Sequence, residues 1–138
     1  MFESKESINI AGKTLAAEAK MVSLIDLNQE RVGFSNKRGD FDKALIYVNI
    51  EGSIGGHTFK TKLTWNDRYK SYMMLYHEGG PHDAIMENFD VLELYKKGKR
   101  TKKTDLYRTI RSNAANSMIF LDVLAKEAVE DYLSHFPE

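Results

Sequence analysis

The chain has 138 residues, no cysteine, and 20 basic side chains against 20 acidic ones. Without cysteine it cannot form disulfides, thiolate metal sites or a thiol nucleophile. A hydrophobic fraction of 42% excludes wholesale disorder. A chain of this length can bury one core, so we expect a single domain over residues 1–138.

Neither an export signal nor a membrane span is expected. Residues 1–13 carry acidic side chains early and no apolar run, unlike a signal peptide. The most apolar stretch, Met118–Ala125, contains an aspartate and is far shorter than the ~20 residues that a membrane-spanning helix needs. We therefore expect a cytoplasmic protein that does not engage a membrane.

The N-terminal third favours strands. The segment Lys13–Asn28 could form an alanine-rich helix or a long strand. From Met21 to Leu27, however, apolar and polar side chains mix without the stripe that a helix would show. We therefore expect one or two strands before residue 34.

A β-hairpin is the clearest local structure. The segments Ala44–Glu51 and His57–Trp65 flank Gly55-Gly56, and glycine supplies the positive φ that both central residues of a two-residue turn need. The other face of the second strand then carries Lys60 and Lys62, so the hairpin has an apolar inner face and a basic outer face. The register that follows pairs Ile46 with Trp65, Val48 with Leu63, Ile50 with Thr61, and Gly52 with Phe59.

Two further elements follow the hairpin. A third strand is expected over Tyr69–Tyr76, where large apolar side chains fall on both faces. Pro81 suits the first position of a helix, because the amide of that position has no intrahelical partner. The segment Phe89–Tyr95 could continue this helix or form a strand.

A long helix is predicted at the C-terminus, with Thr104 or Asp105 as its cap. Ser and Asn in the run 112–117 could divide it, and Met118–Ala125 is apolar almost all round, which predicts a central place in the core. Strands followed by helices indicate an α+β fold. We expect an antiparallel, meander-like sheet of four or five strands in the N-terminal half, packed by the long C-terminal helix.

Charge is gathered into bands. Residues 77–95 hold five acidic side chains and no Lys or Arg, residues 96–111 hold eight basic and one acidic, and residues 112–138 hold five acidic and one basic. A gathered set of cations is typical of a surface that neutralises phosphate, and a neighbouring tyrosine can stack on a base. The alternatives are a solvated loop that balances the acidic bands and a surface for an acidic protein. The candidate polyanion-binding residues are Lys96, Lys97, Lys99, Arg100, Lys102, Lys103, Tyr107, Arg108 and Arg111.

A second candidate site lies in the segment 76–83, whose sequence is YHEGGPHD. Its imidazoles and carboxylates are ligands that zinc, iron and manganese accept. The glycine turn could bring the two histidines together, although their spacing matches no helical metal motif. The alternative is an ordinary strand end followed by a helix cap. The candidate metal ligands are His77, Glu78, His82 and Asp83.

The functional expectation follows from these features and from missing motifs. The sequence contains no nucleophile elbow and no phosphate-binding loop, so an enzyme is less expected than a binding protein. The leading hypothesis is a non-catalytic module that binds a polyanion, either nucleic acid or a nucleotide-like ligand, through a basic loop and helix start. The alternatives are a small interaction, inhibitor or assembly subunit and a hydrolase that uses a divalent metal at His77–Asp83. The apolar surplus in Tyr69–Tyr76 adds a homodimer as a further expectation.

Overall fold

The computed structural model describes residues 2–28, 42–75, 78–89 and 102–135. Within these ranges five strands form one antiparallel sheet in the order β1-β2-β3-β4-β5. The expected α+β fold, with an N-terminal meander and a helical C-terminal part, is therefore confirmed. The elements are β1 (Glu3–Ile10), β2 (Lys13–Asp26), the 3₁₀ helix η2 (Lys43–Leu45), β3 (Ile46–Ile54), β4 (His57–Asn66), β5 (Ser71–Met74), α2 (Pro81–Met86), α4 (Lys102–Ser117) and α5 (Ile119–Ser134).

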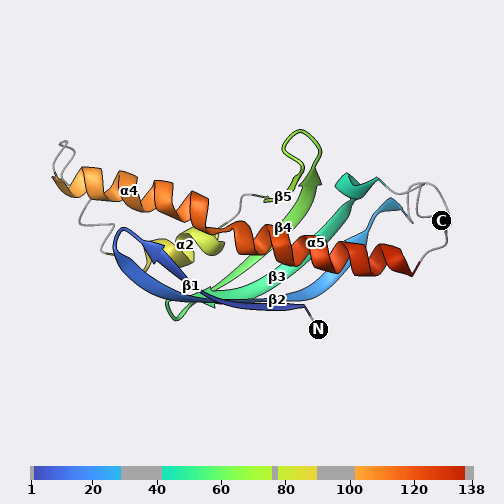
Figure 1. The fold of residues 1–138 in the computed structure, drawn as a ribbon, viewed down its shortest axis with the longest axis horizontal. Helices are drawn as coiled ribbons and strands as arrows, with labels where there is room; N and C mark the ends of the chain where they lie inside the picture. Colours follow the sequence, from blue (N-terminus) through green and yellow to red (C-terminus); the bar gives the residue numbers. More distant parts are fainter. Residues whose placement is uncertain (1, 29–41, 76–77, 90–101, 136–138) are drawn as a thin grey trace.

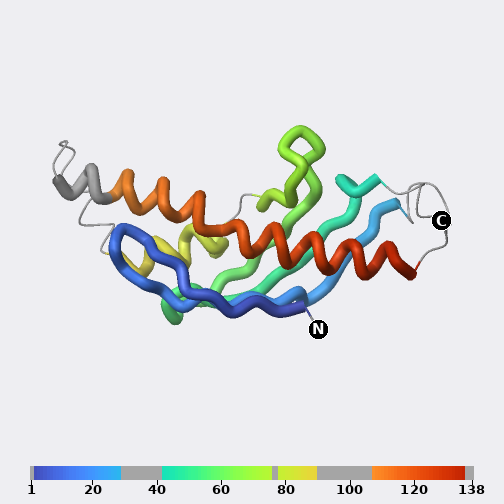
Figure 2. Tube along the Cα trace, in the orientation of Figure 1, coloured from blue at the N-terminus to red at the C-terminus, as the bar shows by residue number. Residues whose placement is uncertain are grey.

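The sheet curls, and α5 lies across its concave inner face (Figure 1). The two long helices meet at a bend, from which α4 runs past the β1–β2 hairpin, while α2 packs nearby (Figure 2). Alternate side chains of β3 and β4, and of β2 up to Met21, point inward to the core, as strand geometry requires. The fully buried side chains include Ile46, Ile50, Leu63, Leu121 and Val129, so strands and α5 share one core.

The predicted hairpin is confirmed in position and register. Val48 pairs with Leu63, and Gly55 and Gly56 hold the turn with φ of +59° and +84°. The N-terminal expectation is confirmed too, because β1 and β2 are two strands that pair from Glu3 to Ile10. The predicted third strand is shorter than Tyr69–Tyr76, since β5 ends at Met74 within the described residues.

Gly52 permits a close approach of β2 and β3. An added Cβ there would lie 1.9 Å from the carbonyl oxygen of Glu18 and 2.9 Å from Cα of Ala19, so β2 and β3 approach too closely for any side chain. Phe59, which is opposite Gly52 in the register, is buried in the core and covers the space beside the glycine. The two strands can therefore pair this closely only where one residue has no Cβ.

Two helix expectations need correction. The cap was expected at Thr104 or Asp105, but α4 begins at Lys102, inside the basic run. The sequence left open whether 112–117 divides the helix; the helix is divided directly after this run, at Met118, whose φ of −95° and ψ of 15° separate α4 from α5. The segment after the bend is not buried all round, because Ile119 and Val123 are 66% and 47% exposed. The helix at Pro81 begins where expected.

Polar contacts fix α5 to the sheet at both of its ends. The Tyr132 hydroxyl donates to Oδ2 of Asp26 over 2.6 Å at the end of β2. Near the start of α5, the Asp122 carboxylate accepts the backbone N–H of Tyr72 over 2.6 Å and thereby satisfies a donor of the edge strand β5. Burial, with the charges of Glu130 and Asp122, raises the pKa of Tyr72 well above its usual range.

We expect Gly52→Ala to destabilise the fold by at least about 2 kcal/mol, because the new methyl group must push β2 and β3 apart. The matched control is Gly56→Ala, where the added methyl meets open space and only the positive φ costs about 1 kcal/mol. Urea unfolding of the two variants and the unsubstituted protein measures the difference. Equal stability of the two variants would contradict the proposed backbone contact.

Candidate functional site

The predicted basic residues fall into three groups. Lys96, Lys97, Lys99 and Arg100 lie outside the described residues. The backbone of Lys102 and Lys103 forms the first turn of α4 rather than a loop. Tyr107, Arg108 and Arg111 lie on the following turns of α4, and their side chains define the part of the predicted polyanion site that can be examined.

The inner side of α4 anchors the helix against the sheet. Ile110 and Ala114 are fully buried at i, i+4 spacing. One residue before Ala114, Asn113 accepts the backbone N–H of Ala11 through Oδ1 over 2.8 Å, which fixes α4 to the turn between β1 and β2. The side of α4 that carries the arginines is consequently held in a defined orientation toward solvent.

Arg108 and Arg111 are both exposed. Neither forms an ion pair with any carboxylate of the described residues. The guanidinium carbon of Arg111 lies 6.0 Å from the centre of the Tyr107 ring, within cation–π range. This part of the site therefore presents two guanidinium groups, one of them beside an aromatic ring, without internal neutralisation by described residues.

The structure also brings α2 to this site. Pro81 and Ile85 are buried, and the Asn88 side chain donates to the carbonyl oxygens of Ile54, over 3.2 Å, and Ala84, over 2.9 Å. This docking leaves His82 half-buried at the junction of α2 and α4. Burial and the nearby charge of Arg111 lower the pKa of His82, and Asp83 opposes them. The neutral form of the His82 imidazole is thus favoured beside Arg111, which has no carboxylate partner among the described residues.

The four predicted metal ligands are not drawn together among the described residues. His77 lies outside them, and no three His, Asp or Glu side chains within them form a group that could hold a metal ion. The Asp83 carboxylate instead accepts the backbone N–H of Gly79 over 2.9 Å, which closes the turn before α2.

Sequence reasoning missed a hollow on the outer face of the sheet. Its volume is about 790 Å³, and it spans β1 to β4. The hairpin register predicted a basic outer face with Lys60 and Lys62, and it gave no sign of a hollow there. The charged side chains that line it are Glu3, Lys5, Glu18, Lys20, Glu51 and Lys60.

Comparison of the chain with models of known protein families, with curated proteins and with solved structures found no match. Among the described helices, none combines the length and the apolar character that crossing a membrane requires.

We expect Arg111→Ala to raise the pKa of His82, because the substitution removes the positive charge that opposes protonation. Burial remains, so the pKa returns only part of the way toward its usual value. An NMR titration of the His82 ring protons measures this change. Arg108→Ala is the control and should leave the pKa of His82 as it is in the unsubstituted protein. If the pKa of His82 is also unchanged in Arg111→Ala, the two side chains do not interact.

Proposed function

We propose that the protein is a non-catalytic binding module for a polyanion, either nucleic acid or a nucleotide-like ligand, with its site along the basic start of α4. One observation carries the proposal: Arg108 and Arg111 stand exposed and have no carboxylate partner among the described residues. Six further cations precede them in the chain between residues 96 and 103. Exposed cations without internal partners are available to phosphate.

The two arginines suit phosphate better than lysines would. A planar guanidinium presents paired N–H donors that match two phosphate oxygens, and it is more weakly hydrated than an ammonium group. The lysines of the basic run add attraction that depends strongly on salt. Each part of the basic run therefore has a separate role in affinity.

Tyr107 and His82 extend the site beyond charge. An aromatic ring beside an arginine offers a stacking platform that tolerates any base, which favours single-stranded over duplex nucleic acid. A neutral His82 adds a hydrogen-bonding group without adding charge, and a phosphate placed at Arg111 would favour its protonation. We therefore expect the affinity for a phosphate-bearing strand to rise on mild acidification.

The test uses a fluorescently labelled oligo(dT) strand and fluorescence anisotropy over a series of salt concentrations. Replacing both Arg108 and Arg111 with alanine should weaken binding by at least about tenfold, because each lost charge-assisted contact to phosphate contributes about 1.5 kcal/mol or more. For a single strand, loss of two phosphate contacts should also reduce the slope of log K against log salt by about 1.4.

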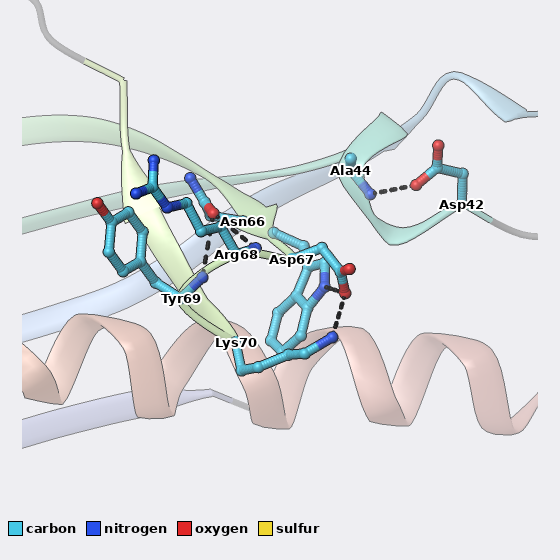
Figure 3. Close-up of polar contacts among 8 residues, drawn as sticks. Asp42, Ala44, Asn66, Asp67, Arg68, Tyr69 and Lys70 are labelled. Atoms are coloured by element: carbon cyan, nitrogen blue, oxygen red, sulfur yellow. Dashed lines mark hydrogen bonds and ion pairs between the residues drawn. The ribbon is translucent and has the colours of Figure 1, made fainter.

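Arg68→Ala is the matched control. Arg68 also lies against a tyrosine, 5.5 Å from the centre of the Tyr69 ring, but in the turn between β4 and β5. Asn66 holds this turn by accepting the backbone N–H groups of Arg68 and Tyr69 over 3.0 and 3.3 Å (Figure 3). The control should bind oligo(dT) like the unsubstituted protein. An equal loss of affinity in the control and in the double variant would show that only the net charge of the protein matters. Absence of oligo(dT) binding by the unsubstituted protein would reject the proposal.

The lysine contribution has its own test. Replacing Lys99, Arg100, Lys102 and Lys103 together with alanine should lower both the affinity and its salt dependence. Unchanged binding in this variant would remove the basic run from the proposal and leave only the two arginines.

A further inference from the structure

The outer face of the sheet is uncovered by the described helices. The helices α2, α4 and α5 pack on the inner side, where alternate strand residues are buried. Large apolar side chains nevertheless remain on the outer side: Ile25, Met73 and Leu75 are 42%, 42% and 43% exposed. Apolar side chains gathered on one open face of a small protein mark an interaction surface.

Charge on this face follows a strict alternation across neighbouring strands. In one cross-strand row, Glu3 of β1 is opposite Lys20 of β2, Lys20 is opposite Glu51 of β3, and Glu51 is opposite Lys60 of β4. The row therefore alternates from acidic to basic across four strands. Lys60 and Glu51 form an ion pair of 3.6 Å within it.

An apolar row lies further along the same strands. Ile25 of β2 is opposite Tyr47 of β3, Tyr47 is opposite Thr64 of β4, and Thr64 is opposite Met73 of β5. Between the charged and apolar rows, the register of β2 shifts at Val22, which is 51% exposed. Cross-strand attraction within one sheet explains the alternating charges, but it does not explain the exposed apolar row.

We propose that the outer sheet face binds a second copy of this chain, with a two-fold axis parallel to the strands and between β2 and β3. Such an axis places β2 of each copy over β3 of the other, and β1 over β4. Because positions along the strands do not change, each cross-strand row of one copy faces the same row of the other. Lys20 then faces Glu51 of the partner, Glu3 faces the partner's Lys60, and Ile25 faces the partner's Tyr47.

A second copy fits this face because the face is complementary to itself. The charged row read in reverse is basic where the original is acidic, so one symmetry axis pairs opposite charges at all four positions. The same axis brings Ile25 of each copy against Tyr47 of the other. The hollow of about 790 Å³ gives the long Lys and Glu side chains of both copies room to interleave. A partner surface of mainly one sign of charge would be repelled by the two side chains of this row that carry the same sign.

The first test measures molar mass by light scattering and sedimentation equilibrium over a range of protein concentrations. The unsubstituted protein should be a dimer, and Ile25→Lys should raise the dimer dissociation constant by at least about tenfold, because it puts a charge in the apolar row. The matched control is Ile119→Lys on α5, which replaces a more exposed isoleucine away from the face and should leave the dimer intact. A monomer at the highest soluble concentration would overturn the proposal, and so would a dimer that Ile25→Lys leaves unchanged.

A charge exchange separates contacts between copies from contacts within one sheet. Lys20→Glu sets two carboxylates against each other across the axis, and Glu51→Lys sets two ammonium groups there, so each variant alone should be monomeric. An equal mixture of the two variants should form a heterodimer, since each contact across the axis then pairs opposite charges. Circular dichroism confirms that both variants are folded. If both are monomeric alone and the mixture stays monomeric, the charges act only within each sheet and the proposed axis is wrong.

Discussion

The close approach of β2 and β3 at Gly52 is the constraint on which the rest of the structure depends. With an added Cβ only 1.9 Å from the carbonyl oxygen of Glu18, this point of the sheet can form only without a side chain. The sheet curls, so the strands wrap α5 instead of lying flat beneath it (Figure 1). Because α5 is buried in the concave face, the strands and the helix share one core. The short strand β5 lies at the edge of the sheet.

The curl also makes the two sides of the sheet different, because only the inner side is concave. The inner side receives α5, which Tyr132 and Asp122 tie to β2 and β5 through hydrogen bonds. Since α5 occupies the concavity, α4 must leave it at Met118, and it is then supported by Ile110, Ala114 and the contact of Asn113 with Ala11. A helix anchored along one side only keeps its other side in water, so Arg108 and Arg111 stay exposed.

Local patterns in the sequence predict the elements well and their assembly poorly. The Gly55-Gly56 turn predicted the hairpin register, because a two-residue turn leaves no freedom in the pairing. Helix ends depend on weaker preferences, so the start of α4 was misplaced, and the break that the run 112–117 allowed lies at the next residue, Met118. The exposure of Ile119 was unpredictable from composition, because it depends on which side of α5 meets the sheet. Likewise, the basic cluster was visible in the sequence, whereas the approach of His82 to Arg111 required two helices to pack.

The two proposed surfaces are related by the direction of the symmetry axis. In a meander the β1–β2 and β3–β4 turns lie at the same end of the sheet, and α4 contacts the first of these turns while Asn88 of α2 contacts the second. An axis parallel to the strands keeps that end of one copy beside the same end of the other. In the proposed dimer the two α4 helices lie toward the same end on opposite outer sides, and we propose that a long polyanion would pass around that end to reach both basic surfaces. Joining two sites in this way raises affinity through effective concentration without a new contact, and it favours long strands over isolated nucleotides.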